Sequence, residues 1–234
     1  MRIFRIGSCR VYSIPNDFNG NFIFLNEPVG YTHTIKEHIQ LIKHLRGEKQ
    51  IPSEFLQYIY TFYGGNQKRQ DIDSLFLHNK LMIDKADLYL VEISSLKVIE
   101  YNGYYFQQNR FLKYSNHNIP PPSEELLVNY KIYTQNDIDF HRDYVALIDE
   151  LRDKPIIFTG HINLKKENNE YIENRQTINT LLEKFSKMHG KFYYDLSTKI
   201  SNSPAEFVSH DLLHLKTKGL ILARDCIREI VGNN

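Results

Sequence analysis

The chain of 234 residues contains no tryptophan and only two cysteines, and its charges nearly cancel. Two cysteines are too few for a disulfide-stapled scaffold. A formal net charge of +1, from 29 Lys and Arg against 28 Asp and Glu, lacks the positive excess typical of proteins that bind nucleic acid or anionic membranes. No apolar run approaches the ~20 residues that span a bilayer. We therefore expect no nucleic acid and no membrane among the partners, and the oligomeric state stays open.

The N-terminus lacks a basic segment followed by an apolar core, so no secretory signal is visible and we expect a cytoplasmic location. That location disfavours a disulfide between Cys9 and Cys226. Cys226 falls within a helical pattern, where we predict a small buried hydrophobic residue. No cluster of Cys and His has zinc-ligand spacing, which predicts no metal.

Apolar strand patterns alternate with helical patterns along the chain, and 41% of the residues are hydrophobic. Strands that are apolar throughout are typical of parallel sheets covered by helices. The alternation predicts an α/β fold, a three-layer α/β/α sandwich with a mostly parallel sheet of about five strands. The predicted strands are residues 2–6, 21–25, 86–95, 155–159 and 191–195. The predicted helices are 35–46, which begins at a Thr34/Glu37 capping box and stops at Gly47, then 53–63, 71–84, 136–152, 171–189 and a last helix from 217.

Residues 97–133 interrupt this alternation. Asn102-Gly103 between two short strand-like runs indicates a hairpin over 98–106. Residues 107–133 contain three consecutive prolines and are predicted to be mostly irregular. We interpret this stretch as a surface insertion in a single domain of residues 1–234, because too little chain follows it for a second core.

Polar residues follow three of the predicted strands at the point where each ends. Gly7-Ser8-Cys9 follows the first strand, Ser94 and Ser95 end the strand of 86–95, and Gly160-His161-Ile162-Asn163 follows the strand of 155–159. Because parallel sheets bind ligands at the carboxyl ends of their strands, we expect these groups to meet in one crevice. Glu92 lies next to the buried part of its strand and must have a partner or a role, since an unpaired buried carboxylate is costly.

A nucleophile and a base can be assigned from the two ends of the chain. A Cys9 thiolate is a strong nucleophile that needs a nearby base to form at neutral pH. His214 could be that base, and Asp211 could fix its tautomer and stabilise the imidazolium. Ser8 could replace Cys9 as nucleophile with the same partners. Backbone N–H groups after Gly7 could bind a developing oxyanion.

These two segments together resemble the SGNH/GDSL hydrolase superfamily. That superfamily carries its nucleophile in a Gly-Asp-Ser element after the first strand and its base in an Asp-x-x-His element before a glycine and a final helix. The resemblance places Cys9 at the nucleophile position, Ser8 at the aspartate, and Asp211-Leu212-Leu213-His214 with Gly219 at the last block. The Gly-Ser-Cys start is similar to the GSCFA branch and to capsular-polysaccharide biosynthesis proteins suspected of acyl transfer. The resemblance implies acyl-ester hydrolysis or acyl transfer on a carbohydrate or glycoconjugate, with no cofactor. For a transferase it implies acyl-CoA as a possible donor.

Two blocks of that superfamily differ in this chain. The third block normally offers an asparagine as oxyanion donor, and Ser94-Ser95 hold that place here. The second-block glycine could be Gly64 or Gly65, or this pair could simply stop a helix. Efficient oxyanion stabilisation therefore does not follow from the motifs.

Other polar residues are further candidates for the site. His33, just before a capped helix, could be a second active-site histidine, a substrate contact or a solvated loop residue. His161 and Asn163 follow a strand that ends near the crevice, so we predict that they line the pocket; the alternative is that they only form the turn. Arg175 could bind an anionic group, although a solvated helix face is the simpler reading.

Two other functions compete with acyl-ester chemistry. The absent third-block asparagine favours a non-catalytic binding module on a degenerate SGNH fold. A thiol-dependent peptidase or amidase could instead use Cys9 with His33 or His161.

Overall fold

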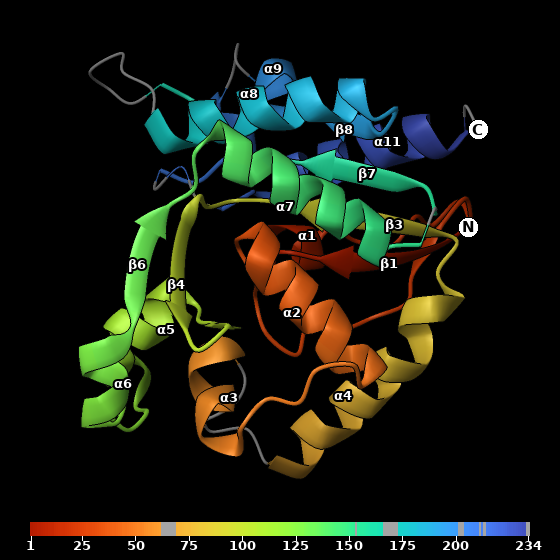
Figure 1. Ribbon diagram of the computed structural model, residues 1–234. Helices are drawn as coiled ribbons and strands as arrows, with labels where there is room; N and C mark the ends of the chain where they lie inside the picture. Colours follow the sequence, from red (N-terminus) through yellow and green to blue (C-terminus); the bar gives the residue numbers. More distant parts are fainter. Residues whose placement is uncertain are drawn as a thin grey trace. The chain divides into compact units, whose positions relative to one another are not determined.

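The computed structural model describes residues 1–61, 69–152, 154–165, 173–200, 204–210, 212 and 214–232 (Figure 1). The chain forms two compact units. The first unit comprises Met1–Leu25, Lys85–Ser95 and Asp153–Asn234, and the second comprises Asn26–Asp84 and Leu96–Arg152. The single-domain organisation stays a prediction.

The first unit is built on a five-stranded sheet in which every neighbouring pair is parallel. Its strand order is β2-β1-β3-β7-β8, so β3 lies between β1 and β7 (Figure 1). The strands are β1 (Arg2–Ile6), β2 (Ile23–Phe24), β3 (Leu88–Glu92), β7 (Ile156–Thr159) and β8 (Phe192–Tyr194). The predicted α/β class, with a five-stranded parallel sheet flanked by helices, is confirmed.

The strand order reverses direction between β1 and β3. From β1 the chain first adds β2 on one side, and all later strands of this sheet are added on the other side. At such a switch point the connections leave the sheet in opposite directions and open a crevice at the carboxyl ends of the two strands. Gly7 follows β1 and Glu92 ends β3, so both lie at this point.

Helices α1 (Cys9–Ser13) and α11 (Thr217–Gly232) share one hydrophobic cluster with the sheet of the first unit. Alternate strand residues point into this cluster because side chains of a strand alternate between its two faces. Cys226 is 4% exposed within it, which confirms the predicted buried thiol. Helix α8 (Glu173–Met188) contacts β7 and β8. The short helices α9 (Leu196–Ile200) and α10 (Pro204–Phe207) complete this unit.

The second unit combines helices with a three-stranded antiparallel sheet of order β5-β4-β6. Thr34 caps α2 and accepts a hydrogen bond from the N–H of Glu37, and Gly47 ends this helix in the left-handed conformation, as predicted. Helices α2 and α7 contact each other. The elements are α2 (Ile35–Arg46), α3 (Ser53–Ile59), α4 (Arg69–Met82), η1 (Ile83–Lys85), β4 (Lys97–Tyr101), β5 (Tyr104–Tyr105), α5 (Gln108–Leu112), η2 (Tyr114–His117), α6 (Glu124–Asn129), β6 (Lys131–Thr134) and α7 (Asp137–Glu150).

The prediction that residues 107–133 are mostly irregular is wrong. This stretch contains α5, η2, α6 and most of β6, and β6 pairs with β4. Ser123 caps α6 directly after the three prolines, and three of the four residues of β6 are exposed, so β6 lacks the apolar alternation that marks a strand. The hairpin is confirmed, with Asn102 and Gly103 at positive φ of 50° and 76°.

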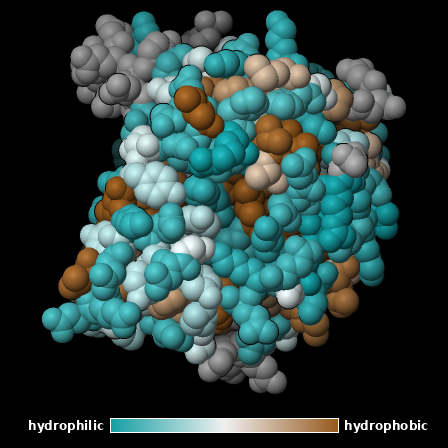
Figure 2. Space-filling model, viewed as in Figure 1, coloured by the Kyte–Doolittle hydropathy of each residue, from teal (hydrophilic) through white to brown (hydrophobic). Residues whose placement is uncertain are grey.

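The surface in Figure 2 is largely hydrophilic, with apolar residues in scattered small groups. Among the most exposed apolar side chains are Phe18 at 86% and Ile138 at 80%. Across the described ranges, no helix is both long enough and apolar enough to cross a membrane.

Candidate active site

A glycine lets the chain turn sharply where β1 ends. Gly7 has a φ of +152°, and a Cβ added there would lie 2.8 Å from Glu92 Cβ. A side chain at this position would therefore push β1 away from β3. Ser8 follows as the N-cap of α1, and its side-chain oxygen accepts from the N–H of Arg10 at 3.3 Å. Cys9 is the first residue of this helix.

The carboxylate of Glu92 lies beneath this turn and is fully enclosed. Its Oε2 accepts hydrogen bonds from the backbone N–H of Ser8 at 3.0 Å and from the Ser8 hydroxyl. Its Oε1 accepts from Nε of Arg10 at 2.5 Å in an ion pair. Glu92 and Ser8 are each 1% exposed. The prediction that Glu92 has a partner is confirmed, and its partners are the two residues on either side of Cys9.

Arg10 connects this carboxylate to the loop after β7. Its Nη1 donates to Nε2 of His161 at 3.0 Å. The other ring nitrogen, Nδ1, lies 3.1 Å from the carbonyl oxygen of Ile162 and must donate to it, which assigns the Nδ1–H tautomer. Polar groups at the ends of β1, β3 and β7 therefore converge, as predicted. His161 cannot accept a proton from Cys9 while its Nε2 lone pair is bound to Arg10.

The Cys9 thiol is partly exposed, and its pKa is raised. Burial is the main cause, the charge of Glu92 adds to it, and the charge of Arg10 opposes it. A thiol with a raised pKa is mostly protonated at neutral pH and needs a base to become a nucleophile. The N–H groups of Ser8 and Arg10 already donate to Glu92 and to the Ser8 hydroxyl, so neither is available to an oxyanion in this arrangement.

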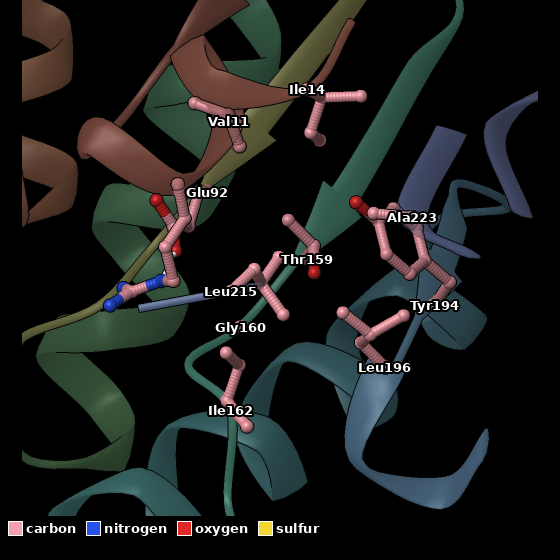
Figure 3. A pocket seen from close by; sticks show the side chains of 11 residues that line it. Val11, Ile14, Glu92, Thr159, Gly160, Ile162, Tyr194, Leu196, Leu215 and Ala223 are labelled. Carbon is pink, nitrogen blue, oxygen red and sulfur yellow. Dashed lines mark hydrogen bonds and ion pairs between the residues drawn. The ribbon is translucent and has the colours of Figure 1, made fainter. Parts of the chain in front are cut away.

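A small cavity of about 20 Å³ lies beside Glu92 (Figure 3). This volume holds about one water molecule. Figure 3 shows Thr159 between Glu92 and Tyr194. Burial raises the pKa of Tyr194, so its phenol stays protonated. The lining residues are Arg10, Val11, Ile14, Glu92, Thr159, Gly160, Ile162, Tyr194, Leu196, Leu215 and Ala223.

This cavity brings the two ends of the chain together. Arg10 and Val11 directly follow Cys9 in α1, and Leu215 directly follows His214. Leu215 also packs against the hydrophobic cluster that contains Val11. The segments that carry Cys9 and His214 therefore meet at one cavity of the first unit.

The loop that carries His214 is held through its backbone. Val208 and Leu215 form an antiparallel bridge, and the carbonyl oxygen of His214 accepts from the N–H and the hydroxyl of Ser209 at 2.9 and 2.8 Å. The side chain of His214 is exposed. Within the described ranges, no hydrogen bond joins the His214 ring to Cys9 or Ser8. Asp211 lies outside the described residues, so its pairing with His214 stays a prediction.

The remaining predicted residues occupy different places. Ser94 and Ser95 follow β3 after Ile93 and are partly buried. The 6%-exposed Asn163 donates from its backbone N–H to the Ser197 hydroxyl at 2.6 Å and lines a separate polar pocket of about 540 Å³. His33 belongs to the second unit, where its ring lies 3.3 Å from the amide nitrogen of Gln107. Gly64 and Gly65 lie outside the described residues.

Arg175 is not on a solvated helix face, and the simpler reading of this residue is wrong. It is 7% exposed, and its Nη1 donates to the carbonyl oxygens of Ile162 and Leu212 at 2.9 and 2.8 Å. It therefore ties the loop after β7 to the loop that carries His214.

Sequence reasoning gave no role to Arg10, Thr159 or Tyr194. One signal was available for Arg10, because a buried glutamate at a strand end requires a cation and Arg10 belongs to the Gly-Ser-Cys turn at the neighbouring strand end. No comparable signal marks Thr159 and Tyr194, which read as ordinary strand residues. Among the residues that the structure describes, no group of three or more His, Cys, Asp and Glu side chains could hold a metal ion.

Comparisons with solved structures found similar proteins. A member of the lipolytic protein G-D-S-L family from Veillonella parvula DSM 2008 superposes with a TM-score of 0.50 at 10% identity, over 98% of this chain and 97% of that chain. A catalytic mutant of an acetylxylan esterase from Geobacillus stearothermophilus is also similar, with a TM-score of 0.47 at 10% identity, over 99% of this chain and 94% of that chain. No curated protein sequence matches the chain.

The Veillonella structure shows that the chain has the SGNH/GDSL fold that its motifs predict. The family model described as the TviD N-terminal domain matches residues 1–125, which is more than half of the chain. The chain therefore belongs to the TviD N-terminal domain family.

Proposed function

We propose that the protein is an acyl-ester hydrolase or acyltransferase that uses Cys9 as its nucleophile and His214 as its base. The observation that carries this proposal is the shared cavity, lined by Arg10 and Val11 from the Cys9 segment and by Leu215 from the His214 segment. It lies at the switch point of a parallel sheet, where α/β proteins bind their ligands.

The first half of the reaction transfers an acyl group to sulfur. His214 takes the proton of the Cys9 thiol, and the thiolate attacks the ester carbonyl. The carbonyl oxygen becomes an oxyanion, and the tetrahedral intermediate collapses as the C–O bond breaks and His214 returns the proton to the leaving alcohol. Asp211 would orient His214 and stabilise its imidazolium. Ser94 and Ser95, at the end of β3, are the proposed oxyanion donors.

The second half of the reaction decides between hydrolysis and transfer. Water attacks the thioester in a hydrolase, and a sugar hydroxyl attacks it in a transferase, with His214 taking the proton of the attacking O–H group. The C–S bond then breaks, the acid or the new ester leaves, and His214 returns the proton to the Cys9 thiolate. For a transferase the proposed donor is an acyl-CoA, whose own thioester would replace the ester in the first half. The proposed carbohydrate substrate rests on the similarity of Gly7-Ser8-Cys9 to polysaccharide-biosynthesis proteins.

The surroundings of Ser8 support Cys9 as the nucleophile. Ser8 is 1% exposed, and its hydroxyl proton is already donated to Glu92. Cys9 is partly exposed. The bond between Arg10 and Nε2 of His161 also opposes a peptidase that uses His161 as its base.

The test is a panel of acyl esters and acyl-CoA donors, the latter with sugar acceptors, assayed with wild type, Cys9→Ala, Ser8→Ala and His214→Ala. We expect Cys9→Ala to abolish turnover and His214→Ala to lower kcat. Ser8→Ala should keep measurable activity, because Ser8 supports the turn and does not react. Full activity of Cys9→Ala, or full activity of His214→Ala, would contradict the proposal.

A non-catalytic binding module is the second candidate, and the raised pKa of the Cys9 thiol favours it. A module of this kind would bind glycans with equal affinity in wild type and in Cys9→Ala, and would turn over no ester or thioester. Measurable turnover that depends on Cys9 excludes it.

A further inference from the structure

One carboxylate binds the residues on both sides of Cys9. Glu92 holds the N–H and the hydroxyl of Ser8 through Oε2 and the guanidinium of Arg10 through Oε1. We propose that Glu92 is a positioning residue that, together with Arg10, fixes the Cys9 thiol at the switch point of the sheet. The catalytic consequence rests on the proposed function, whereas the placement of the thiol can be tested without it.

Glu92 acts through its neighbours and not on a substrate. It is 1% exposed, and each of its oxygens already accepts a hydrogen bond. Its two contacts with Ser8 fix the residue before Cys9, and its contact with Arg10 fixes the residue after it. The backbone of Cys9 is therefore held from both sides while these contacts persist. Gly7, with its close approach to Glu92, brings the turn within reach of this carboxylate.

The burial of this ion pair points in the same direction. The side chains of Arg10 and Glu92 are 10% and 2% exposed. Removing two charges from water carries a penalty that their attraction often fails to exceed, so apolar side chains of similar volume would stabilise such a site at least as well. Stability alone does not explain why this buried ion pair is present, whereas placement of the Cys9 thiol does.

The two charges act on the thiol with opposite signs. Glu92 raises the pKa of Cys9 and Arg10 lowers it, and these are the charged groups that influence the thiol among the described residues. Neutralising Glu92 leaves the guanidinium uncompensated and should lower the pKa of Cys9. Neutralising Arg10 leaves the carboxylate uncompensated and should raise it. The alkylation midpoint therefore reports the two charges at the thiol, and the turnover of Glu92→Asp reports the placement of the thiol.

The test measures alkylation of Cys9 by iodoacetamide as a function of pH, with each thiol quantified by mass spectrometry of its peptide. Cys226 is 4% exposed and reports unfolding in the same sample. We expect Glu92→Gln to move the midpoint of Cys9 alkylation to lower pH and Arg10→Met to move it to higher pH, while Cys226 stays protected in both. The combined variant should lie nearer to wild type than either single change.

A second arm measures turnover with the same variants. A misplaced nucleophile should lower kcat by about 100-fold with little change in KM, because an error of about 1 Å in position has this effect. Glu92→Asp keeps the charge and shortens the side chain, so it should lower kcat while the alkylation midpoint stays near that of wild type. Asp143→Asn is the matched control, since Asp143 is 6% exposed and paired with Lys36 in the second unit.

The outcomes separate the two proposals. If Glu92→Gln and Arg10→Met both leave the Cys9 midpoint unchanged with Cys226 protected, the positioning role is wrong. If Glu92→Gln unfolds, as shown by rapid alkylation of Cys226, Glu92→Asp and Arg10→Met decide the role. In that case the positioning role is wrong if the midpoint of Cys9 alkylation in Arg10→Met equals that of wild type, or if Glu92→Asp keeps full kcat. Absence of all ester and thioester turnover in wild type overturns the proposed function, while the alkylation data still decide the role of Glu92.

Discussion

Val11 and Leu215 line the same cavity although they come from opposite ends of the chain. Val11 lies two residues after Cys9 in α1, and Leu215 directly follows His214. Both residues also belong to the hydrophobic packing around β1, β3 and β7. The core of the first unit therefore holds the segment that carries Cys9 and the segment that carries His214 at one cavity.

Replacing His214 should separate activity from stability. Its side chain is exposed, so His214→Ala should change the free energy of unfolding by less than about 0.5 kcal/mol. Loss of a general base should lower kcat by about 100- to 10,000-fold. Steady-state kinetics and urea unfolding of the same preparation measure both quantities.

His210 provides the control for this prediction. It is another exposed histidine of the same loop. His210→Ala should leave both kcat and stability close to those of wild type. Equal losses of activity in the two variants would indicate a general effect of the loop and would contradict a role for His214 as base.

The turn at Gly7 should tolerate no side chain. Its φ of +152° is one that side-chain-bearing residues rarely adopt, and a Cβ would lie 2.8 Å from Glu92 Cβ. Gly7→Ala should lower the free energy of unfolding by about 1–3 kcal/mol for the backbone conformation, and by more for the clash with β3. Urea denaturation measures this change.

Gly20 offers a comparison without the clash. It also has a positive φ, of +79°, but a Cβ there would meet nothing within 4 Å. Gly20→Ala should therefore lower stability by only about 1 kcal/mol. A smaller loss for Gly7→Ala than for Gly20→Ala would show that the approach of β1 to Glu92 is not tight.

The Cys9 thiol should ionise at higher pH than an ordinary cysteine. Burial and the charge of Glu92 raise its pKa, and Arg10 only partly opposes them. Because the thiolate is the reactive form, the rate of alkylation should rise with pH around a midpoint above the ordinary value of about 8.5. The same protein unfolded in guanidinium provides the reference, and a folded-state midpoint below that reference would contradict the prediction.

Stability of the second unit should depend on the protonation of Glu37. Burial raises the pKa of this carboxyl from its ordinary value of 4.5 to about 8. The native state therefore holds a proton that the unfolded state releases between these values. The stabilisation is fully present below a pH of about 4.5 and is lost as the pH rises towards about 8, with a slope of up to about 1.4 kcal/mol per pH unit.

Glu37→Gln removes this titration and should flatten the dependence of unfolding free energy on pH. Glu48→Gln, which changes an exposed glutamate just after the same helix, should leave the slope as it is in wild type. Thermal unfolding from pH 5 to pH 8 measures both variants. A wild-type slope retained by Glu37→Gln would contradict the assignment.

The parallel sheet could be predicted because its strands are apolar throughout. Leu88–Glu92 is buried at all five positions. In a chain whose strand patterns alternate with helical patterns, such an apolar run is typical of a strand in a parallel sheet. Strand β6 could not be predicted, because three of its four residues are exposed and its pairing with β4 depends on backbone contacts. The short helices of the second unit could not be predicted either, because they depend on caps and packing more than on a periodic apolar pattern.

The candidate site could also be predicted only in part. The ends of β1, β3 and β7 could be brought together from the sequence, because carboxyl ends of parallel strands share one edge of the sheet. The partners within that crevice could not. Arg10 reaches both Glu92 and His161. The need of a buried glutamate for a cation pointed to the first contact, but no sequence signal marks the second.

The measurement that tests the central claim most directly is the mass of the acylated enzyme. Wild type and His214→Ala are mixed with a reactive acyl ester or acyl-CoA, quenched in acid and digested, and the acylated peptide is sequenced. The account predicts an acyl group on Cys9 of wild type, formed far more slowly in His214→Ala and absent from Cys9→Ala. An acyl group on Ser8, or catalytic turnover without any acyl group on Cys9, would contradict it.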